Sequence, residues 1–158
     1  MANRLEQPRL QTVNNSNLNR SKNMGYNTTK RDYNWSNWNE ALDHVWKYER
    51  NGSFKIMHNT IASIDGANNV SITLHNTDIY KIELGPILPD NVTRIFPAQQ
   101  CIITLDSGGY QTVTTKDRMN RFLPLGYRVY QKDFDWYLQT PEGTREYQDG
   151  MQIKLELA

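Results

Sequence analysis

The stretch VSITLHNTDIYKIEL, residues 70–84, decides the expected fold. Its two halves carry apolar residues at every second position: Val70, Ile72 and Leu74, then Tyr80, Ile82 and Leu84. A period of two is typical of a half-buried β-strand, because successive side chains point alternately to the core and to water. The polar residues between the halves, 75–78, are typical of a turn. The stretch therefore predicts two antiparallel strands that share one apolar face.

Short segments of the same kind lie on both sides of this stretch. We expect strands near 54–58, 60–64, 101–105, 110–114, 127–131, 134–139 and 151–157. Asp106-Ser-Gly-Gly109 predicts a tight hairpin turn that returns residues 110–114 as a strand. The alternation in 134–139 places Phe134 and Trp136 in the core. The expected fold class is α+β, mainly an antiparallel β meander of six to eight strands with two helices.

Two segments predict helices. Asn37 with Glu40 three residues later is typical of a reciprocal N-cap, and Asn51-Gly52 predicts the end of that helix after about 13 residues. The residues that share one stripe at helical spacing, expected to lie against an apolar surface, are Trp38, Ala41, Leu42, Val45 and Glu49. Thr115 predicts the N-cap of a second, short helix, with Asp117 near its positive end and Met119, Phe122 and Leu123 on its inner side.

The charge of the chain is strongly segregated. Residues 1–32 form a basic, Asn-rich arm that we expect to be disordered, and 33–158 form a single β-rich globular domain. The net charge is +5 over residues 1–31 and +4 over 116–132, so the rest of this +1 chain carries −8. Such segregation favours an anionic partner that is met at two places. The alternative is a solvated tail and an ordinary charged face.

The sequence gives no sign of catalysis or of a resident metal. Cys101 is the only cysteine, so we expect a buried hydrophobe with no disulfide and no structural zinc site. The three histidines, His44, His58 and His75, lack partners at ligand spacing. Ser107 has no nucleophile-elbow context. No apolar stretch of membrane-spanning length or signal segment is present, and we expect a soluble, non-enzymatic protein without a cofactor.

One segment is suited to an anionic ligand. Hydroxyl groups precede a helix start beside Lys116, where unsatisfied N–H groups and the helix dipole favour phosphate. Tyr130 beside Arg128 suits the stacking of a base, with Tyr137 as a second exposed ring. The predicted nucleic-acid- or phosphate-binding residues are Thr114, Thr115, Lys116, Arg118, Asn120, Arg121, Arg128 and Tyr130. The alternative is an ordinary capped helix whose cations Asp117 neutralises.

Four blocks of this sequence resemble a family of small proteins of tailed bacteriophages, including phages of cyanobacteria and actinobacteria. The blocks are Leu74–Ile79, Leu105–Tyr110, Thr112–Asn120 and Gln131–Leu138. In the family an aromatic residue, often Trp, follows the Gly-Gly pair, where this chain has Tyr110. The resemblance covers about residues 59–152, so the arm and the first helix look like additions. It implies a phage origin and transfers no catalytic residues.

Phage origin favours accessory roles in host takeover that need no catalysis: binding nucleic acid, blocking a host defence protein or sequestering a nucleotide signal. The leading hypothesis is a non-enzymatic accessory protein in the host cytoplasm that binds nucleic acid through the arm and the Thr/Lys/Arg site. The second is an anti-defence sponge that sequesters a nucleotide signal in a pocket near 114–120. The third is a virion or partner-binding structural protein. A host or phage protein partner, and self-association into a homo-oligomer, stay open.

Overall fold

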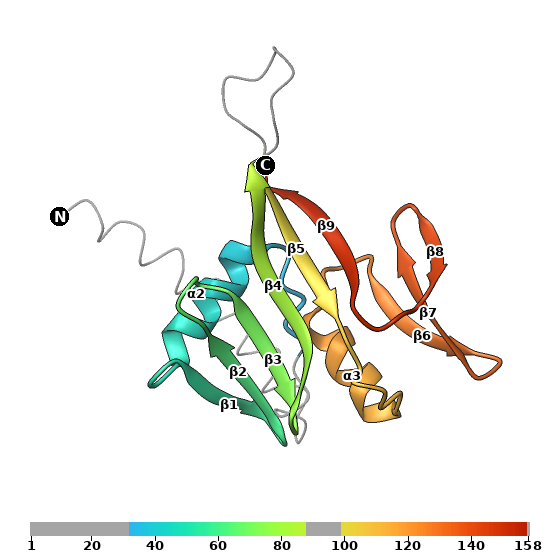
Figure 1. The fold of residues 1–158 in the computed structure, drawn as a ribbon, viewed down its shortest axis with the longest axis horizontal. Coiled ribbons are helices and arrows are strands. Elements are labelled where there is room, and N and C mark those ends of the chain that lie inside the picture. Colours follow the sequence, from blue (N-terminus) through green and yellow to red (C-terminus); the bar gives the residue numbers. More distant parts are fainter. Residues whose placement is uncertain (1–31, 88–98, 158) are drawn as a thin grey trace, which may run out of the picture. The chain divides into compact units, whose positions relative to one another are not determined.

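The structure is a computed structural model, and it describes residues 32–87 and 99–157 (Figure 1). The predicted arm therefore lies outside the described residues, apart from Asp32. The helices are α2 (Trp38–Tyr48) and α3 (Val113–Phe122). The strands are β1 (Ser53–Met57), β2 (Thr60–Ile64), β3 (Val70–Leu74), β4 (Thr77–Ile87), β5 (Gln99–Leu105), β6 (Arg128–Lys132), β7 (Asp135–Thr140), β8 (Gly143–Glu146) and β9 (Met151–Leu157).

The strands form two antiparallel sheets. The six-stranded sheet has the order β1-β2-β3-β4-β5-β9, and the small sheet has the order β6-β7-β8. The predicted α+β, mainly antiparallel β class is confirmed. The described residues contain nine strands, one more than the expected upper number. β8 has the sequence GTRE, which shows no apolar alternation and therefore gave no strand prediction. All four of its residues are exposed.

The predicted pairing of the stretch 70–84 is confirmed. β3 and β4 are antiparallel neighbours, and their register places Ile72 opposite Tyr80 and Val70 opposite Ile82. These side chains lie on the buried face of the six-stranded sheet. The register shifts after Ile72, where a β-bulge lets β4 bury both Ile79 and Tyr80.

The predicted hairpin after β5 is wrong. The two neighbours of β5 are β4 and β9, and residues 110–112 lead into α3 instead of returning as a strand. β9 adds Ile153 opposite Ile103 on the buried face, whereas Tyr110 and Val113 are exposed. β9, whose residues show the apolar alternation, therefore occupies the edge of the six-stranded sheet beside β5. Gly108 and Gly109 have positive φ values of 62° and 84°, and they form the turn by which the chain leaves the sheet.

The N-cap of α3 is also different from the expected one. Thr112 caps the helix, because its Oγ1 accepts a hydrogen bond of 3.1 Å from the backbone N–H of Thr115. The helix therefore begins at Val113, and Asp117 lies in its second turn, away from the positive end. Met119, Phe122 and Leu123 are buried as predicted.

The N-cap of α2 is confirmed at Asn37, whose Oδ1 accepts from the backbone N–H of Glu40 at 3.0 Å. The reciprocal contact differs from the expected capping box. Glu40 accepts from the backbone N–H and the hydroxyl of Ser36, at 2.9 and 2.6 Å, and not from Asn37. The helix ends at Tyr48, earlier than Asn51-Gly52 predicted, and buries Ala41, Leu42 and Val45.

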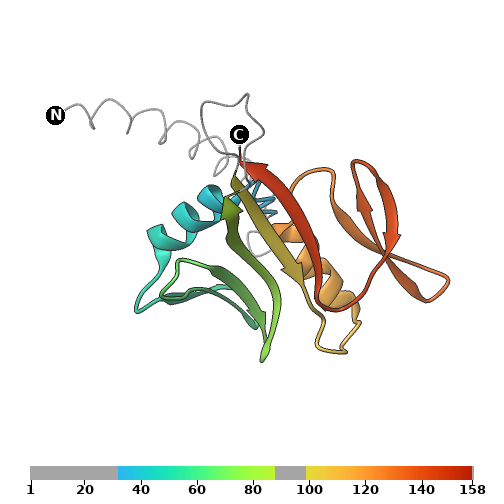
Figure 2. The ribbon, with the colours of Figure 1, turned by 45° about the horizontal axis from the view of Figure 1, so that its top comes forward.

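Both helices lie on one face of the six-stranded sheet (Figure 2). Trp35, just before α2, packs its ring 5.9 Å from Tyr80 of β4 and 5.0 Å from Phe122 of α3. This aromatic cluster joins the helices to the sheet and forms the centre of the core. Cys101 is buried in the same core, as predicted. None of the described helices has the length and apolarity needed to span a membrane.

The structure separates two aromatic residues that the alternation placed together. Trp136 is 3% exposed, so its prediction as a core residue is confirmed. Phe134 is 91% exposed, and its prediction as a core residue is wrong. β7 begins only at Asp135, and Phe134 belongs to the two-residue turn between β6 and β7.

Candidate functional site

The two arginines of α3 are held by contacts within the protein. Arg118 and Arg121 were both predicted to bind nucleic acid or phosphate, but Arg121 is only 8% exposed. Its Nε and Nη2 donate to the two oxygens of Asp117 at 3.0 and 3.1 Å, and its Nη1 lies 3.2 Å from Asp32 Oδ1. Arg118 donates to Asp117 at 2.7 Å and to the hydroxyl of Thr60 at 3.1 Å. Asp117 thus pairs with both guanidinium groups, and Asp32 supplies a second carboxylate beside Arg121.

Asn120 and Thr115 also use their polar atoms internally. The Asn120 amide donates to the carbonyl of Val129 at 2.8 Å and accepts from its N–H at 2.7 Å, which joins α3 to β6. Thr115 is buried, and its hydroxyl lies 3.0 Å from that of Thr112. The Asn120 contacts fix α3 against β6, and the Thr115 contact belongs to the N-cap of α3.

The other four predicted residues stay at the surface, in two separate places: Thr114, Lys116, Arg128 and Tyr130. Lys116 Nζ lies 5.7 Å from the centroid of the Trp136 ring and 3.4 Å from Gln131 Oε1. Gln131 and Trp136 are partners across β6 and β7, so they share one face of the small sheet. Arg128 and Tyr130 alternate with Gln131 and point to the opposite face. The structure therefore does not bring the predicted residues into one site.

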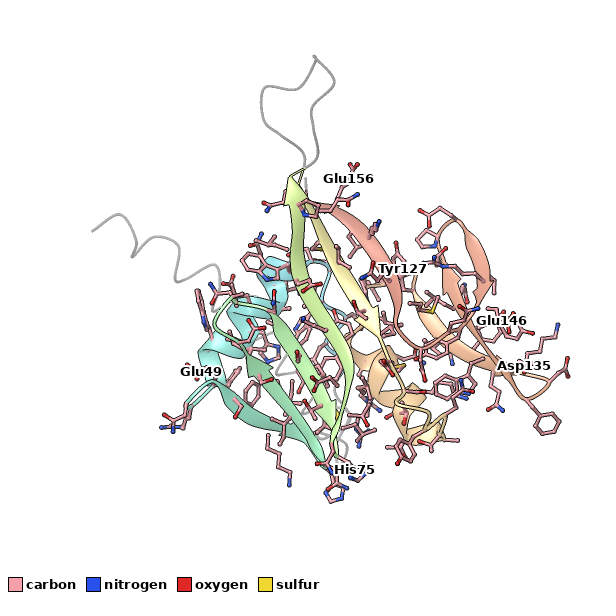
Figure 3. All side chains as sticks on the ribbon, viewed as in Figure 1. Glu49, His75, Tyr127, Asp135, Glu146 and Glu156 are labelled. Carbon is pink, nitrogen blue, oxygen red and sulfur yellow. The ribbon has the colours of Figure 1, made fainter. Side chains whose placement is uncertain are left out.

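The outer face of the small sheet is the surface that keeps the predicted aromatic and cationic groups. We use this name for the side of β6, β7 and β8 on which strand pairing places Arg128, Tyr130, Lys132, Asp135, Tyr137, Gln139, Thr144 and Glu146. On β6, Val129 is buried on the other side, and Arg128, Tyr130 and Lys132 share this face. Figure 3 labels Asp135 and Glu146 on this sheet.

Two tyrosines form the centre of the outer face. Tyr130 and Tyr137 are cross-strand partners with ring centroids 5.7 Å apart and an angle of 27° between the ring planes. Burial raises the pKa of Tyr137, and the carboxylates of Asp135, Glu146 and Asp133 raise it further. Its hydroxyl therefore stays protonated at neutral pH and remains a hydrogen-bond donor.

A second polar cluster surrounds Asp149, which lies in the segment between β8 and β9. Its carboxylate accepts from the backbone N–H and the hydroxyl of Ser107, both at 2.7 Å. It also accepts from the Gly109 N–H at 3.1 Å and from the Tyr147 hydroxyl at 2.8 Å. Ser107 is buried, so Asp149 holds the Ser-Gly-Gly turn against the segment before β9. These contacts give Ser107 a structural role.

Asp149→Ala is expected to lower the free energy of unfolding by about 1–2 kcal/mol, because the buried Ser107 groups lose their acceptor. Burial raises the pKa of Asp149, but hydrogen bonds from Ser107, Tyr147 and Gly109 outweigh it and leave the pKa below its ordinary value of 3.8. The lowered pKa stabilises the fold above pH about 4 and this contribution is lost as pH falls further. Urea unfolding at pH 7 and pH 3 measures both effects. A loss of unfolding free energy in the variant that is as large at pH 3 as at pH 7 would contradict the predicted pH dependence.

A groove lies between β8 and β9. The sponge hypothesis places its pocket near residues 114–120, and none of these residues is among those that line the groove. Its volume is about 430 Å³, and Tyr127, Arg145, Ile153 and Lys154 are among the residues that line it. Arg145 Nη2 also donates to the backbone carbonyl of Gln152 at 3.2 Å, which ties the edge of the small sheet to β9. Among the described residues, no group of three His, Cys, Asp or Glu side chains is arranged to hold a metal ion.

These features define the chain as an α+β protein with helices on one face of its large sheet and an aromatic, charged face on a second, small sheet. Residues 39–154 match the model of the family described as Kyanoviridae Gp96 protein, and the chain belongs to this family of phage proteins. The predicted phage origin is thereby confirmed at the level of the family. The match begins at Asn39, so all of α2 except Trp38 lies inside it, contrary to the expectation that the first helix is an addition. No curated protein and no solved structure matches the chain.

Proposed function

We propose that this phage protein is a non-enzymatic accessory protein that binds single-stranded nucleic acid on the outer face of the small sheet, in the cytoplasm of the host. The observation that carries the proposal is the Tyr130–Tyr137 pair between Arg128 and Lys132. Tyrosine rings on a sheet stack unpaired bases without regard to sequence, and neighbouring cations contact the phosphates.

Charge supports a division of labour between the sheet and the arm. On the outer face Arg128 and Lys132 are balanced by Asp135 and Glu146, so electrostatic attraction there is weak. The arm, residues 1–31, carries +5, and the remainder of the chain carries −4. We therefore assign the general attraction for phosphates to the arm and the preference for unpaired bases to the tyrosines.

Tyr130→Ala is expected to weaken binding of a fluorescein-labelled oligothymidylate by roughly five- to a hundredfold, the value of one stacked base. Tyr130→Phe keeps the ring and is expected to bind like the unaltered protein. Tyr110→Ala is the matched control, because Tyr110 is an exposed tyrosine outside this face. Fluorescence anisotropy measures the Kd, and thermal melts exclude unfolding. Equal affinities of the Tyr130→Ala and Tyr110→Ala variants would exclude the outer face as the site.

Two charge variants are expected to act in opposite directions. Arg128→Gln removes a phosphate contact and is expected to reduce the slope of log K against log salt by about 0.7. Glu146→Gln removes a repelling carboxylate and is expected to tighten binding about two- to fivefold. A salt titration of both variants measures these changes. The six cations of the arm are Arg4, Arg9, Arg20, Lys22, Lys30 and Arg31. Their replacement by Gln is expected to weaken the binding of single-stranded and of duplex nucleic acid alike.

A further inference from the structure

Phe134 is unfavourable for the fold of its own chain. It is the second residue of the two-residue turn between β6 and β7, in which Asp133 and Phe134 have φ values of 51° and 71°. Turns with two positive φ values strongly favour Gly at this position, because a side chain is strained there. The ring is also 91% exposed, so no burial offsets the strain. Phe134 therefore fits a contact outside the domain better than a role inside it.

The surroundings of Phe134 indicate what it contacts. Asp133 and Asp135 flank the ring, and Lys132 is the one cation of this four-residue hairpin tip, residues 132–135. All four residues are exposed. Two carboxylates beside the ring repel a phosphate backbone, so the tip is poorly suited to nucleic acid. A complementary surface has an apolar floor and a cationic rim.

The groove between β8 and β9 has these properties. Tyr127 supplies the aromatic part of its lining, because Ile153 is only 2% exposed, and Arg145 and Lys154 supply two cations against the carboxylate of Glu142. Its volume of about 430 Å³ is sufficient for one aromatic ring. β8 and β9 are edge strands of their sheets.

The tip cannot enter the groove of its own chain. The six residues of β7 separate the tip from the β7–β8 turn that borders the groove, a distance of roughly 20 Å along the strand. Figure 3 shows Asp135 beside the tip at the far end of the small sheet, and Tyr127 next to β9. A contact between tip and groove therefore requires a second copy of the protein.

We propose that the hairpin tip of one copy inserts Phe134 into the β8–β9 groove of another copy, with Asp133 and Asp135 facing Arg145 and Lys154. The two surfaces differ, so the contact is heterologous and builds a ring or an open chain of copies. Phe134, Arg145 and Lys154 lie outside the proposed nucleic-acid site, whereas Asp135 belongs to the outer face that carries this site.

Complementation between two variants of the full chain tests this contact. Phe134→Gly removes the aromatic ring of the tip and keeps the groove. Lys154→Glu reverses one charge at the rim of the groove and keeps the tip. Each variant alone is expected to sediment as a monomer at concentrations where the unaltered protein associates. Their equimolar mixture is expected to form a 1:1 heterodimer, because one intact tip meets one intact groove. Analytical ultracentrifugation at low salt measures the species.

Three results would overturn the proposal. The first is that the unaltered protein stays monomeric at concentrations up to ~1 mM. The second is that Phe134→Gly associates like the unaltered protein, and the third is that the mixture of the two variants stays monomeric. Thermal melts check folding, and Phe134→Gly is expected to melt at an equal or higher temperature because Gly relieves the strained φ. As a second test, Asp135→Lys is expected to abolish association, and Asp135→Lys with Lys154→Glu in one chain is expected to restore at least a tenth of the original association constant. Failure of this rescue would also contradict the predicted charge pairing.

Discussion

Trp136→Ala is expected to lower the free energy of unfolding by about 3–5 kcal/mol. Trp136 is 3% exposed, packs edge-on against Tyr147 with ring centroids 5.3 Å apart, and carries Lys116 above its ring. Its removal leaves a cavity beneath the small sheet and exposes the Tyr147 ring. Because Tyr147 also donates to Asp149, the loss extends to the Ser107 turn. Urea denaturation followed by circular dichroism measures the change.

The matched control for this variant is Phe134→Ala, an aromatic residue two positions earlier in the same strand pattern. We expect it to change the free energy of unfolding by less than about 0.5 kcal/mol, because its ring is exposed. If Phe134→Ala destabilised the protein as strongly as Trp136→Ala, the assignment of these two rings to surface and core would be wrong.

Arg121→Ala is expected to cost about 3 kcal/mol of unfolding free energy, which is the lower end of the range for breaking a buried ion pair. The Arg121 side chain is 9% exposed and contacts both Asp117 and Asp32. The cost stays at the lower end because the side chains of Asp117 and Asp32 are 39% and 68% exposed, and water solvates them after the change. Chemical denaturation at neutral pH measures the loss.

Lys116→Ala separates a structural role of the α3 cations from a binding role. Lys116 contacts Gln131 and the Trp136 ring only at longer distances, so the variant is expected to stay within about 1 kcal/mol of the unaltered protein. Equal losses for Lys116→Ala and Arg121→Ala would contradict the assignment of Arg121 as a structural residue. Unchanged stability of Arg121→Ala would return this residue to the candidates for ligand binding.

Local patterns predicted the elements whose signal lies within a few residues. The alternation in 70–84 predicted β3 and β4, and that in 151–157 predicted β9. Asn37 predicted the start of α2, because an N-cap depends on contacts within one turn. The turn Asp106–Gly109 was predicted as a turn, but not the direction in which the chain continues. That direction depends on which strand pairs with β5, and β9 lies almost fifty residues further on.

The candidate site shows the same limit more strongly. The sequence indicated a cluster of cations and hydroxyls near Lys116, but it gave no means to distinguish free cations from paired ones. Asp32 and Thr60, which engage Arg121 and Arg118, lie 89 and 58 residues away in the chain. Only Arg128 and Tyr130 kept the predicted surface position on β6, because the period of two in a strand fixes their common face.

By itself, the sequence determined the α+β class, the existence of most strands and helices, the buried side of most of them and the phage family, because these follow from short-range periodicity and from motifs. The tertiary structure alone decided the partner of β5, the exposure of Phe134 against the burial of Trp136, and the internal pairing of the α3 arginines. Each of these depends on contacts between segments far apart in the chain, and such contacts leave no local pattern in the residues that make them.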